Sequence, residues 1–195
     1  MRYSTSHKTE TRAKILLEAS RLIRRDGIEA TGVSDLMAAA GLTNGAFYAH
    51  FASKEALVSD AVVAALGETQ AAIGARIRAA EPAARLDALL SHYLDPKHVA
   101  HPEKGCAIAA LGPELARRPD TTRAAINTAL DELIETVAEA LPEGPNQLAS
   151  ARAVFATLVG TIQLARNSPE SQVAQVLASG RIAARTIVTT QTNMN

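Results

Sequence analysis

Apolar residues recur along this chain at helical spacing, and its β-branched residues are scattered rather than alternating with polar ones. A first helix is predicted from about residue 9 to residue 26, and Gly27 follows as a left-handed stop. Its apolar members fall at i, i+1, i+4, i+7 and i+8 and so share one face: Ile15, Leu16, Ala19, Leu22 and Ile23. The pattern predicts an all-α protein.

Two short helices are predicted after the first. One covers about residues 33–40 and ends at Gly41. The other opens after Thr43, whose hydroxyl is expected to accept a hydrogen bond from a backbone N–H two or three positions on. Phe47 and Phe51 are four residues apart and share its buried face, while Tyr48 points elsewhere. Helices this short are unstable alone, so their buried faces must pack against the first helix.

A long helix is predicted from Lys54 to about residue 80, with Ser53 as its N-cap. Five helices follow at about 82–94, 104–112, 119–141, 145–167 and 169–190, bounded by prolines and glycines. Pro113 is expected to interrupt its segment, giving a short helix, a kink and a further turn. The expected domains are a small helical unit at 1–53 and a larger helical unit at 54–195, joined by the long helix.

Composition narrows the class of protein. The chain has 195 residues and is 47% hydrophobic, which is enough for a small and a larger core without disulfides. The single cysteine, Cys106, excludes an intramolecular disulfide and a cysteine zinc cluster, so an intracellular location is the default. No uninterrupted apolar run approaches the roughly 18 residues of a membrane span, and the first twenty residues are too polar for a signal peptide. We expect a cytoplasmic protein with no cofactor and no membrane partner.

The net charge is zero, but the charges are unevenly distributed. Residues 1–54 hold eight Lys or Arg against five Asp or Glu, whereas residues 55–195 hold twelve against fifteen. Solvated surfaces differ in charge by this much through chance. The excess of positive charge in residues 1–54 therefore favours a nucleic-acid partner only if a DNA-binding motif is also present there.

Two short helices joined by GLT and preceded by a bracing helix have the spacing of a helix-turn-helix. A recognition helix in the major groove needs hydrogen-bond donors for the flanking phosphates, which Thr43, Tyr48 and Lys54 provide. Phe47 and Phe51 would fix that helix from behind. Such a turn between short amphipathic helices also occurs in many helical bundles, so the spacing alone leaves both interpretations open.

Residues 9–63 carry a more specific signal, because they resemble the amino-terminal domain of TetR-type transcriptional regulators. The segment AAGLTNGAFYAHFASKEAL is similar to that family's alanine-glycine turn, its Gly-x-x-Tyr-x-His-Phe pattern and its Ser-Lys-Glu-x-Leu pattern. The resemblance implies that five residues lie at or near DNA, mostly at phosphates: Thr43, Gly45, Tyr48, His50 and Lys54.

The positions that would read bases depart from the pattern of the family. Many members have Lys or Arg where this chain has Asn44, and a larger side chain where it has Ala49. Asn44 can contact adenine in a bidentate manner, and Ala46 or Ala49 can contact a thymine methyl. Gly32 replaces the usual Ser or Thr that caps the second helix and reaches a phosphate. Glycine tolerates an N-cap, so we expect the helix to form with weaker phosphate anchoring there.

In the same family the carboxyl-terminal domain, which corresponds here to residues 54–195, binds a small molecule and dimerises. Four residues of the helix at about 145–167 fall at i, i+3, i+4 and i+7 and share one face: Thr157, Gly160, Thr161 and Leu164. This face is interpreted as part of a four-helix dimer interface, and packing against the chain's own core is the alternative. The effector pocket is expected among the helices of about 55–141. Beyond residue 55 only Tyr93 and Phe155 are aromatic, so a mainly aliphatic cavity for an apolar ligand is favoured over an aromatic cage.

The segment SHYLDPKHVAHPEKGC allows two sharper interpretations. It contains four potential metal ligands: His92, His98, His101 and Cys106. Their spacing matches no established pattern and prolines mark a loop, so we expect solvated histidines without a metal. Cys106 follows Gly105 at a helix start, as in some TetR-type regulators, and could be a low-pKa thiolate that senses oxidants. The alternative is a small buried hydrophobe.

These features together predict a homodimeric, ligand-responsive transcriptional repressor. It would bind a palindromic operator in double-stranded DNA and be released when an effector changes the separation of its front domains. An enzyme is not expected, because there is no nucleophile and base pair, phosphate-binding glycine loop or paired-carboxylate motif. The alternatives are a metal-dependent helical-bundle enzyme built on His92, His98 and His101, and a ligand-independent architectural DNA binder.

Overall fold

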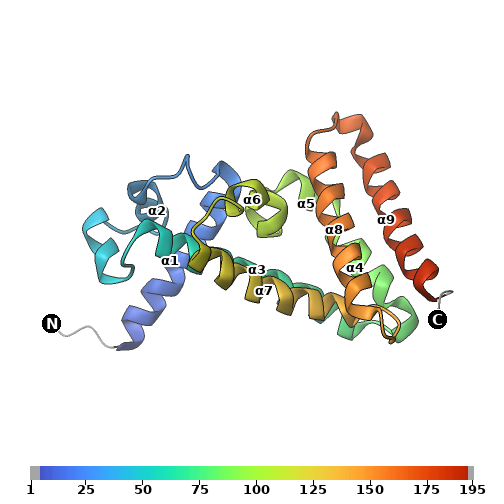
Figure 1. The fold of residues 1–195 in the computed structure, drawn as a ribbon. Coiled ribbons are helices and arrows are strands. Elements are labelled where there is room, and N and C mark those ends of the chain that lie inside the picture. Colours follow the sequence, from blue (N-terminus) through green and yellow to red (C-terminus); the bar gives the residue numbers. More distant parts are fainter. Residues whose placement is uncertain (1–4, 193–195) are drawn as a thin grey trace.

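The computed structural model describes residues 5–192, and every regular element in that range is helical (Figure 1). The all-α prediction is therefore confirmed. The α-helices of the described range are α1 Thr5–Asp26, α2 Val33–Ala39, α3 Lys54–Ala79, α4 Arg85–Tyr93, α5 Pro96–Ala100, α6 Ala107–Leu115, α7 Asp120–Ala138, α8 Gln147–Arg166 and α9 Glu170–Thr192. Short 3-10 helices lie between them: η1 Asn44–Ala49, η2 Pro82–Ala84 and η3 Pro102–Lys104.

The amino-terminal unit packs α1, α2 and η1 around a shared apolar centre, which includes the buried side chains of Ile15, Ala19, Ile23, Leu36, Met37, Phe47 and Phe51. Helix α2 ends as predicted at Gly41, whose φ of +72° lies in the region that favours glycine. There the backbone N–H of Leu42 donates to the carbonyl of Met37 at 2.9 Å, which closes a Schellman turn. Helix α1 begins four residues before the predicted start, because its first turn is polar and apolar periodicity cannot mark it.

Helix α3 connects the two parts of the molecule. It begins at the predicted N-cap, where the Ser53 hydroxyl oxygen accepts from the N–H of Ala56 at 3.1 Å. It packs against α1 near its start and runs beside α7 across the molecule, toward the end where α8 and α9 lie (Figure 1). By length and composition, α3 and α8 would suffice to cross a membrane, although neither is an uninterrupted apolar run. Both pack against other helices, α3 against α1, α4 and α7, and α8 against α7 and α9.

Pro113 does not end its helix, so the predicted end of that helix at about residue 112 was wrong. Helix α6 continues through Pro113 to Leu115. A proline inside a helix leaves the carbonyl four residues earlier without its backbone donor. That carbonyl belongs to Ala109, and it accepts instead from Arg166 at 2.7 Å and from Gln163 at 2.5 Å, both on α8. Side chains from a distant helix therefore satisfy the acceptor that Pro113 frees.

The segment between α4 and α6, predicted as a loop, contains α5 and η3. Each of these begins with proline at its first position, where the missing N–H costs nothing. The Asp95 carboxylate caps α5 by accepting from the N–H of Lys97 at 2.7 Å. The prolines that suggested a loop therefore begin short helices.

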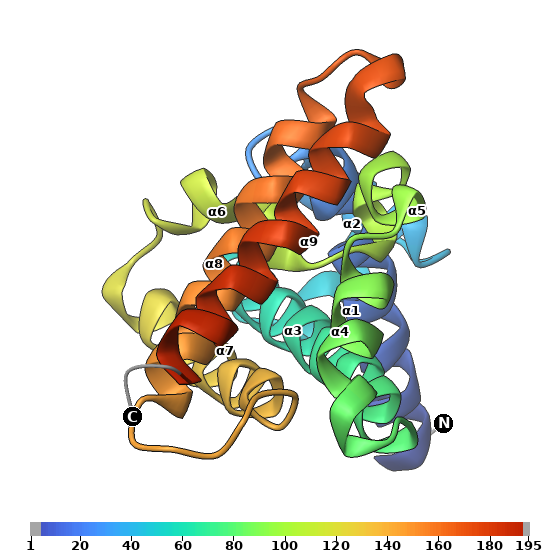
Figure 2. The same ribbon diagram turned by 90° about the vertical axis from the view of Figure 1, so that its right-hand side faces the viewer.

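Helices α8 and α9 form an antiparallel pair (Figure 2), which lies at the end of the molecule opposite the amino-terminal unit (Figure 1). Their contact is close, because a Cβ added at Gly180 of α9 would overlap the side chain of Thr161 on α8. Thr161 is accordingly buried within its own chain, which agrees for this residue with the alternative of packing against the chain's own core, and the dimer interface stays a prediction. Gly160 and Leu164, from the same predicted stripe, are exposed, and Thr157 is half-buried.

Candidate functional site

The helix-turn-helix geometry predicted at residues 33–51 forms, with η1 as its second element. Gly32 stands at the N-cap of α2 in an extended conformation, and its N–H donates to the Asp35 carboxylate at 2.9 Å. Helix α2 thus forms without a hydroxyl cap, as expected. Thr43 is the N-cap of η1, but its side chain makes no capping hydrogen bond, so that part of the prediction was wrong. Its backbone carbonyl instead accepts from the N–H of Ala46 at 3.0 Å, the i to i+3 pattern of a 3-10 helix.

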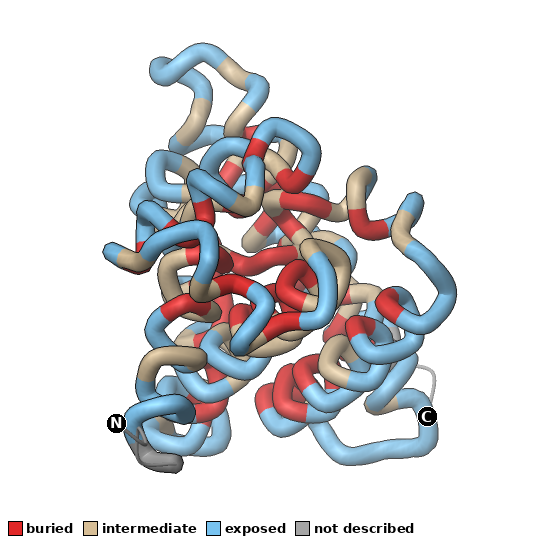
Figure 3. The backbone as a smooth tube through the Cα atoms, turned by 90° about the vertical axis from the view of Figure 1, so that its left-hand side faces the viewer, coloured by how far each residue is buried: buried red, intermediate tan, exposed pale blue. Residues whose placement is uncertain are grey.

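The aromatic residues of η1 and of the turn that follows it divide as predicted between a buried and an exposed face. Phe47 is fully buried and Phe51 nearly so, with ring centroids 5.9 Å apart. Tyr48 is 80% exposed, and its ring meets that of Phe47 edge-on at 5.1 Å. Viewed from this end of the molecule, buried residues form an interior layer beneath an exposed outer surface (Figure 3). The phenol of Tyr48 thus projects from a helix that is anchored from behind.

The remaining predicted contacts on this surface differ in exposure. Asn44, Gly45 and Ala49 are exposed, whereas Ala46 is half-buried and packs against the core, which leaves its methyl little reach toward a base. His50 is half-buried with its Nδ1 buried and unpartnered among the described residues. Burial lowers the pKa of His50, and the charges of Lys8 and Arg12 lower it further.

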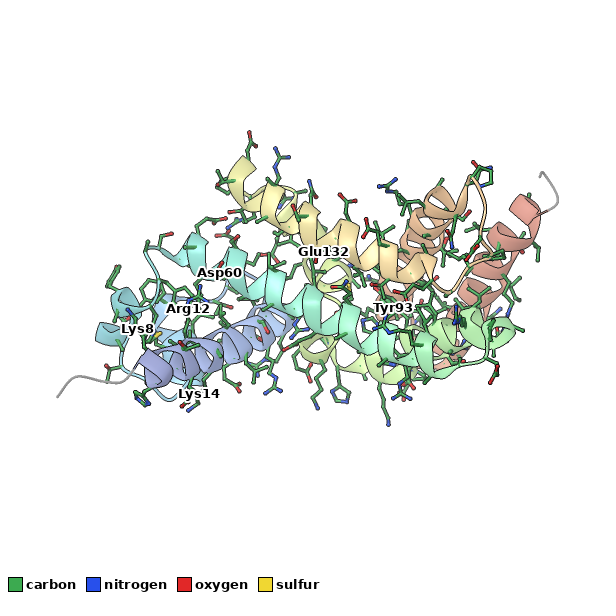
Figure 4. All side chains as sticks on the ribbon, turned by 90° about the horizontal axis from the view of Figure 1, so that it is seen from below. Lys8, Arg12, Lys14, Asp60, Tyr93 and Glu132 are labelled. Atoms are coloured by element: carbon green, nitrogen blue, oxygen red, sulfur yellow. The ribbon has the colours of Figure 1, made fainter. Side chains whose placement is uncertain are left out.

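Lys54 is held by the protein itself. Its ammonium nitrogen donates to the carbonyl of Ile28 at 2.8 Å, which ties the start of α3 to the turn between α1 and α2. Nearby, Arg12 pairs with Asp60 between α1 and α3 and lies 4.9 Å above the Phe51 ring (Figure 4). An ammonium carries three donors, so Lys54 keeps donors for a second acceptor.

A cavity of about 760 Å³ lies where α1 meets the rear helices. Most of the residues that line it are of charged or polar type: Arg24, Glu68, Thr69, Ala72, Ile73, Arg76, His92, Tyr93, Asp95, Lys97, His98, His101, Lys104, Gly105 and Cys106. This lining differs from the mainly aliphatic one expected for the effector pocket, and the character of that pocket stays a prediction. The rings of Tyr93 and Phe155 meet edge-on at 5.9 Å, and the Tyr93 side chain is buried. These two aromatics therefore pack together and do not form a cage.

His98 is a structural residue and not a solvated one. Its Nδ1 donates to the carbonyl of Tyr93 at 2.8 Å, and its Nε2 accepts from the N–H of Cys106 at 3.0 Å. This pair of bonds requires the neutral imidazole, and burial lowers the pKa of His98 to about 4. Both ring nitrogens are occupied, and the described residues contain no group of three or more side chains placed to hold a metal ion.

Cys106 is only 1% exposed, although it borders the cavity. It stands at the N-cap of α6 against Tyr93, so a reagent must displace part of the cavity wall to reach the thiol. The burial agrees with the hydrophobic alternative, and oxidant sensing by Cys106 stays a prediction.

The comparison with family models decides the identity of the front unit. Residues 15–61 match the model described as "Bacterial regulatory proteins, tetR family". The amino-terminal domain is a TetR-family domain. The match begins within α1 and ends within α3, so it covers the whole helix-turn-helix and much of the bracing helix behind it.

Solved structures extend the TetR-like fold over nearly the whole chain. A TetR-family regulator from Cytophaga hutchinsonii is 20% identical with a TM-score of 0.78, covering 95% of this chain and 98% of that one. The reduced form of E. coli NemR is 19% identical with a TM-score of 0.75, covering 92% and 97%. FadR from Bacillus subtilis in complex with stearoyl-CoA is 18% identical with a TM-score of 0.69, covering 90% and 97%. Among curated proteins, none matches this sequence.

Two acidic contacts that the sequence did not reveal join the TetR-family domain to the rear helices. The Glu114 carboxylate on α6 accepts from the backbone N–H of Ile28 at 2.8 Å. Glu55, at the start of α3, accepts from Arg118 at 3.3 Å and from the Thr122 hydroxyl at 2.7 Å. These partners lie more than sixty residues apart along the chain, and no local pattern relates them.

Proposed function

We propose that this protein is a ligand-responsive transcriptional regulator that acts as a repressor in the cytoplasm. Residues 1–53 would bind DNA, and residues 54–195 would bind an effector and dimerise. The observation that carries the proposal is the exposed phenol of Tyr48 on a short helix fixed by Phe47, within a matched TetR-family domain. The helix would present donors to a DNA groove while its buried face packs against α2 and the shared apolar centre of the unit.

The DNA contacts proposed for this surface follow the exposure of its residues. Tyr48, Thr43 and His50 would meet phosphates, and Lys54 would add a phosphate contact to its bond with Ile28. Asn44 and Ala49 are the exposed side chains available to read bases. Gly45 is exposed with open space around its Cα, which allows a sugar-phosphate backbone to approach.

A palindromic operator requires a twofold dimer, for which α8 and α9 offer a surface. Leu164 on α8 is 66% exposed and Ile182 on α9 is 65% exposed, although both are large apolar side chains. Gly160 lies one turn before Leu164, and a Cβ added to it would meet no atom within 4 Å. This face is therefore proposed as the dimer interface in place of the predicted four-residue stripe.

The response to an effector would travel through the contacts between the two parts of the chain. Arg24 of α1 donates to the carbonyl of Gly105 at 2.6 Å, and Glu114 of α6 accepts from Ile28. The carbonyl of Ile28 also accepts from Lys54, which is proposed to contact a phosphate. A shift of α6 would therefore move Ile28 and, with it, the position of Lys54. An effector that favours one arrangement of these contacts would change DNA affinity.

Selection of bound fragments from a random DNA library tests this proposal. Selected fragments should contain an inverted repeat, and sedimentation should show a dimer. Leu164→Asp and Ile182→Asp should each shift the protein to monomer, whereas Ala125→Asp on the exposed side of α7 should not. Selection without an enriched site, or a dimer unaffected by both substitutions, would overturn the corresponding part of the proposal.

A further inference from the structure

The cavity of about 760 Å³ has the size of a small-molecule site and a marked charge bias. Its wall carries the cationic side chains of Arg24, Arg76, Lys97 and Lys104. The two carboxylates that border it are already engaged, because Glu68 lies 3.7 Å from Arg24 and Asp95 caps α5.

The cationic side chains at the rim are not neutralised by the protein. Among the arginines of the described range, Arg76 and Arg117 are the two whose side chains make no hydrogen bond or ion pair. Lys97 and Lys104 are likewise exposed and have no carboxylate partner there. An unpaired cluster of this kind attracts anions strongly, because nearby cations add their potentials.

The floor of the cavity adds a poorly satisfied polar group. Tyr93 is 2% exposed, and its hydroxyl oxygen is buried without an oxygen or nitrogen partner in the described structure. The Cys106 thiol beside it is a weak hydrogen-bonding group. A buried hydroxyl without a good partner destabilises the fold, so an acceptor brought by a ligand would be favoured. Figure 4 places Tyr93 in the rear part of the molecule, far from Lys8, Arg12 and Lys14 of the front unit.

A second cavity, of about 830 Å³, has the opposite character. It lies between η2, the start of α4, the end of α7 and α9, and it does not touch α1. Three glutamates and one arginine border it: Glu135, Glu139, Glu143 and Arg85. Of these two cavities, the first alone combines excess positive charge with contact to the DNA-binding unit.

We propose that the first cavity binds a small organic anion, a carboxylate or a phosphate ester. Its charged group would face Arg76, Lys97 and Lys104, and its apolar body would lie over Ala72 and the Tyr93 ring. A bidentate clamp is not required, because point charges at the rim suffice to select an anion over a neutral molecule.

The inference rests on the proposed function, since the anion is taken to be the effector. The same cavity wall contains the joint between the two parts of the chain, where Arg24 of α1 donates to the carbonyl of Gly105. Gly105 is confined, because a Cβ added there would overlap the imidazole of His98. An anion bound beside this joint competes with Glu68 for Arg24 and so favours one position of α1.

Calorimetric titration of the full-length protein without DNA tests the site. The probes are benzoate, phenyl phosphate and the uncharged benzamide, at low ionic strength. We expect one or both anions to bind and benzamide not to bind. Arg76→Gln and Lys97→Gln should each weaken binding about tenfold, as expected for loss of a charged partner. Arg117→Gln, which removes the other unpaired arginine, should leave the affinity unchanged.

The tighter of the two anions identifies the chemical class of the ligand. No binding of either anion, or equal affinity in the Arg76→Gln and Arg117→Gln variants, would overturn the inference. Fluorescence anisotropy with a selected DNA fragment separates it from the proposed function. Anion binding without any change in DNA affinity would leave a site that is not the effector site, which overturns the effector assignment alone. A protein that binds no DNA but still binds the anion would overturn the proposed function and retain the site.

Discussion

The carboxylate of Glu114 accepts a hydrogen bond from the backbone N–H of Ile28 at 2.8 Å, and so joins α6 to the turn that precedes the helix-turn-helix. It also accepts from the N–H of Glu29 at 3.3 Å. The turn itself begins at Gly27, whose φ of +91° is the left-handed conformation predicted from the sequence. Glu114 therefore satisfies backbone donors that the turn leaves outside any helix.

Replacing Glu114 by alanine should leave both N–H groups without their acceptor and lower the free energy of unfolding by about 1–3 kcal/mol. The measurement is urea unfolding followed by circular dichroism. Glu135→Ala is the control, since Glu135 is exposed on α7 and makes no side-chain hydrogen bond in the described structure. Equal stability of the two variants would show that the Glu114 contact contributes little.

Tyr48 and Lys54 should respond differently to substitution, although both are proposed to meet phosphates. Tyr48→Phe removes an exposed hydroxyl, so stability should stay within about 0.5 kcal/mol while affinity falls for selected and random DNA alike. Lys54→Ala also removes the bond to Ile28, so stability should fall by about 1 kcal/mol. For Lys54→Ala, the slope of log DNA affinity against log salt concentration should become shallower by about one.

Anisotropy titrations at several salt concentrations measure these effects. A Lys54→Ala variant with the wild-type salt slope would show that the ammonium serves only the Ile28 carbonyl. A Tyr48→Phe variant with unchanged affinity would remove that hydroxyl from the proposed contacts.

The sequence predicts those parts of the structure that depend on neighbours along the chain. The left-handed turn at Gly41 and the buried pair Phe47 and Phe51 follow from local rules on glycine and on i, i+4 spacing. Pro113 stays helical because Arg166, more than fifty residues later, bonds the carbonyl that it frees. Packing between distant helices determines such hydrogen-bond partners and brings the charged side chains together at the cavity. The periodicity of apolar residues along the sequence carries no information on that packing.

Gly45 offers a test that separates DNA contact from folding. A Cβ added there meets no atom within 4 Å, and the backbone is not left-handed. Gly45→Ala should therefore fold, with stability raised by about 0.5 kcal/mol through lower entropy of the unfolded chain. If DNA approaches this position closely, affinity should fall about tenfold or more, because the methyl group occupies space at the backbone of the DNA.

Gly67→Ala is the matched control for this experiment. Gly67 is exposed on α3, and a Cβ added to it also meets no atom within 4 Å. Both variants should be slightly stabilised in urea, and only Gly45→Ala should lose DNA affinity. Equal DNA affinity in the two variants would contradict a close approach of DNA at Gly45.

The stability of the protein should fall as the pH drops from 7 to 5, because His98 is held in its neutral form. Its pKa is lowered to about 4 by burial, against 6.5 for the ordinary side chain. Between these values the unfolded chain binds a proton that the folded chain does not, so protonation favours unfolding. For this one group the loss from pH 7 to pH 5 is about 2 kcal/mol. Burial also lowers the pKa values of His50 and His92, which acts in the same direction.

Urea unfolding of the wild-type protein and of His98→Gln at both pH values measures the His98 contribution. The glutamine does not titrate, so the variant should lose less stability between pH 7 and pH 5 than the wild type, whatever its stability at pH 7. The control is His101→Gln, because His101 is exposed and its ring pairs with Glu103 of the adjoining short helix η3. If His98→Gln and the wild type lost equal stability on acidification, the buried neutral ring of His98 would not be the source of the acid sensitivity.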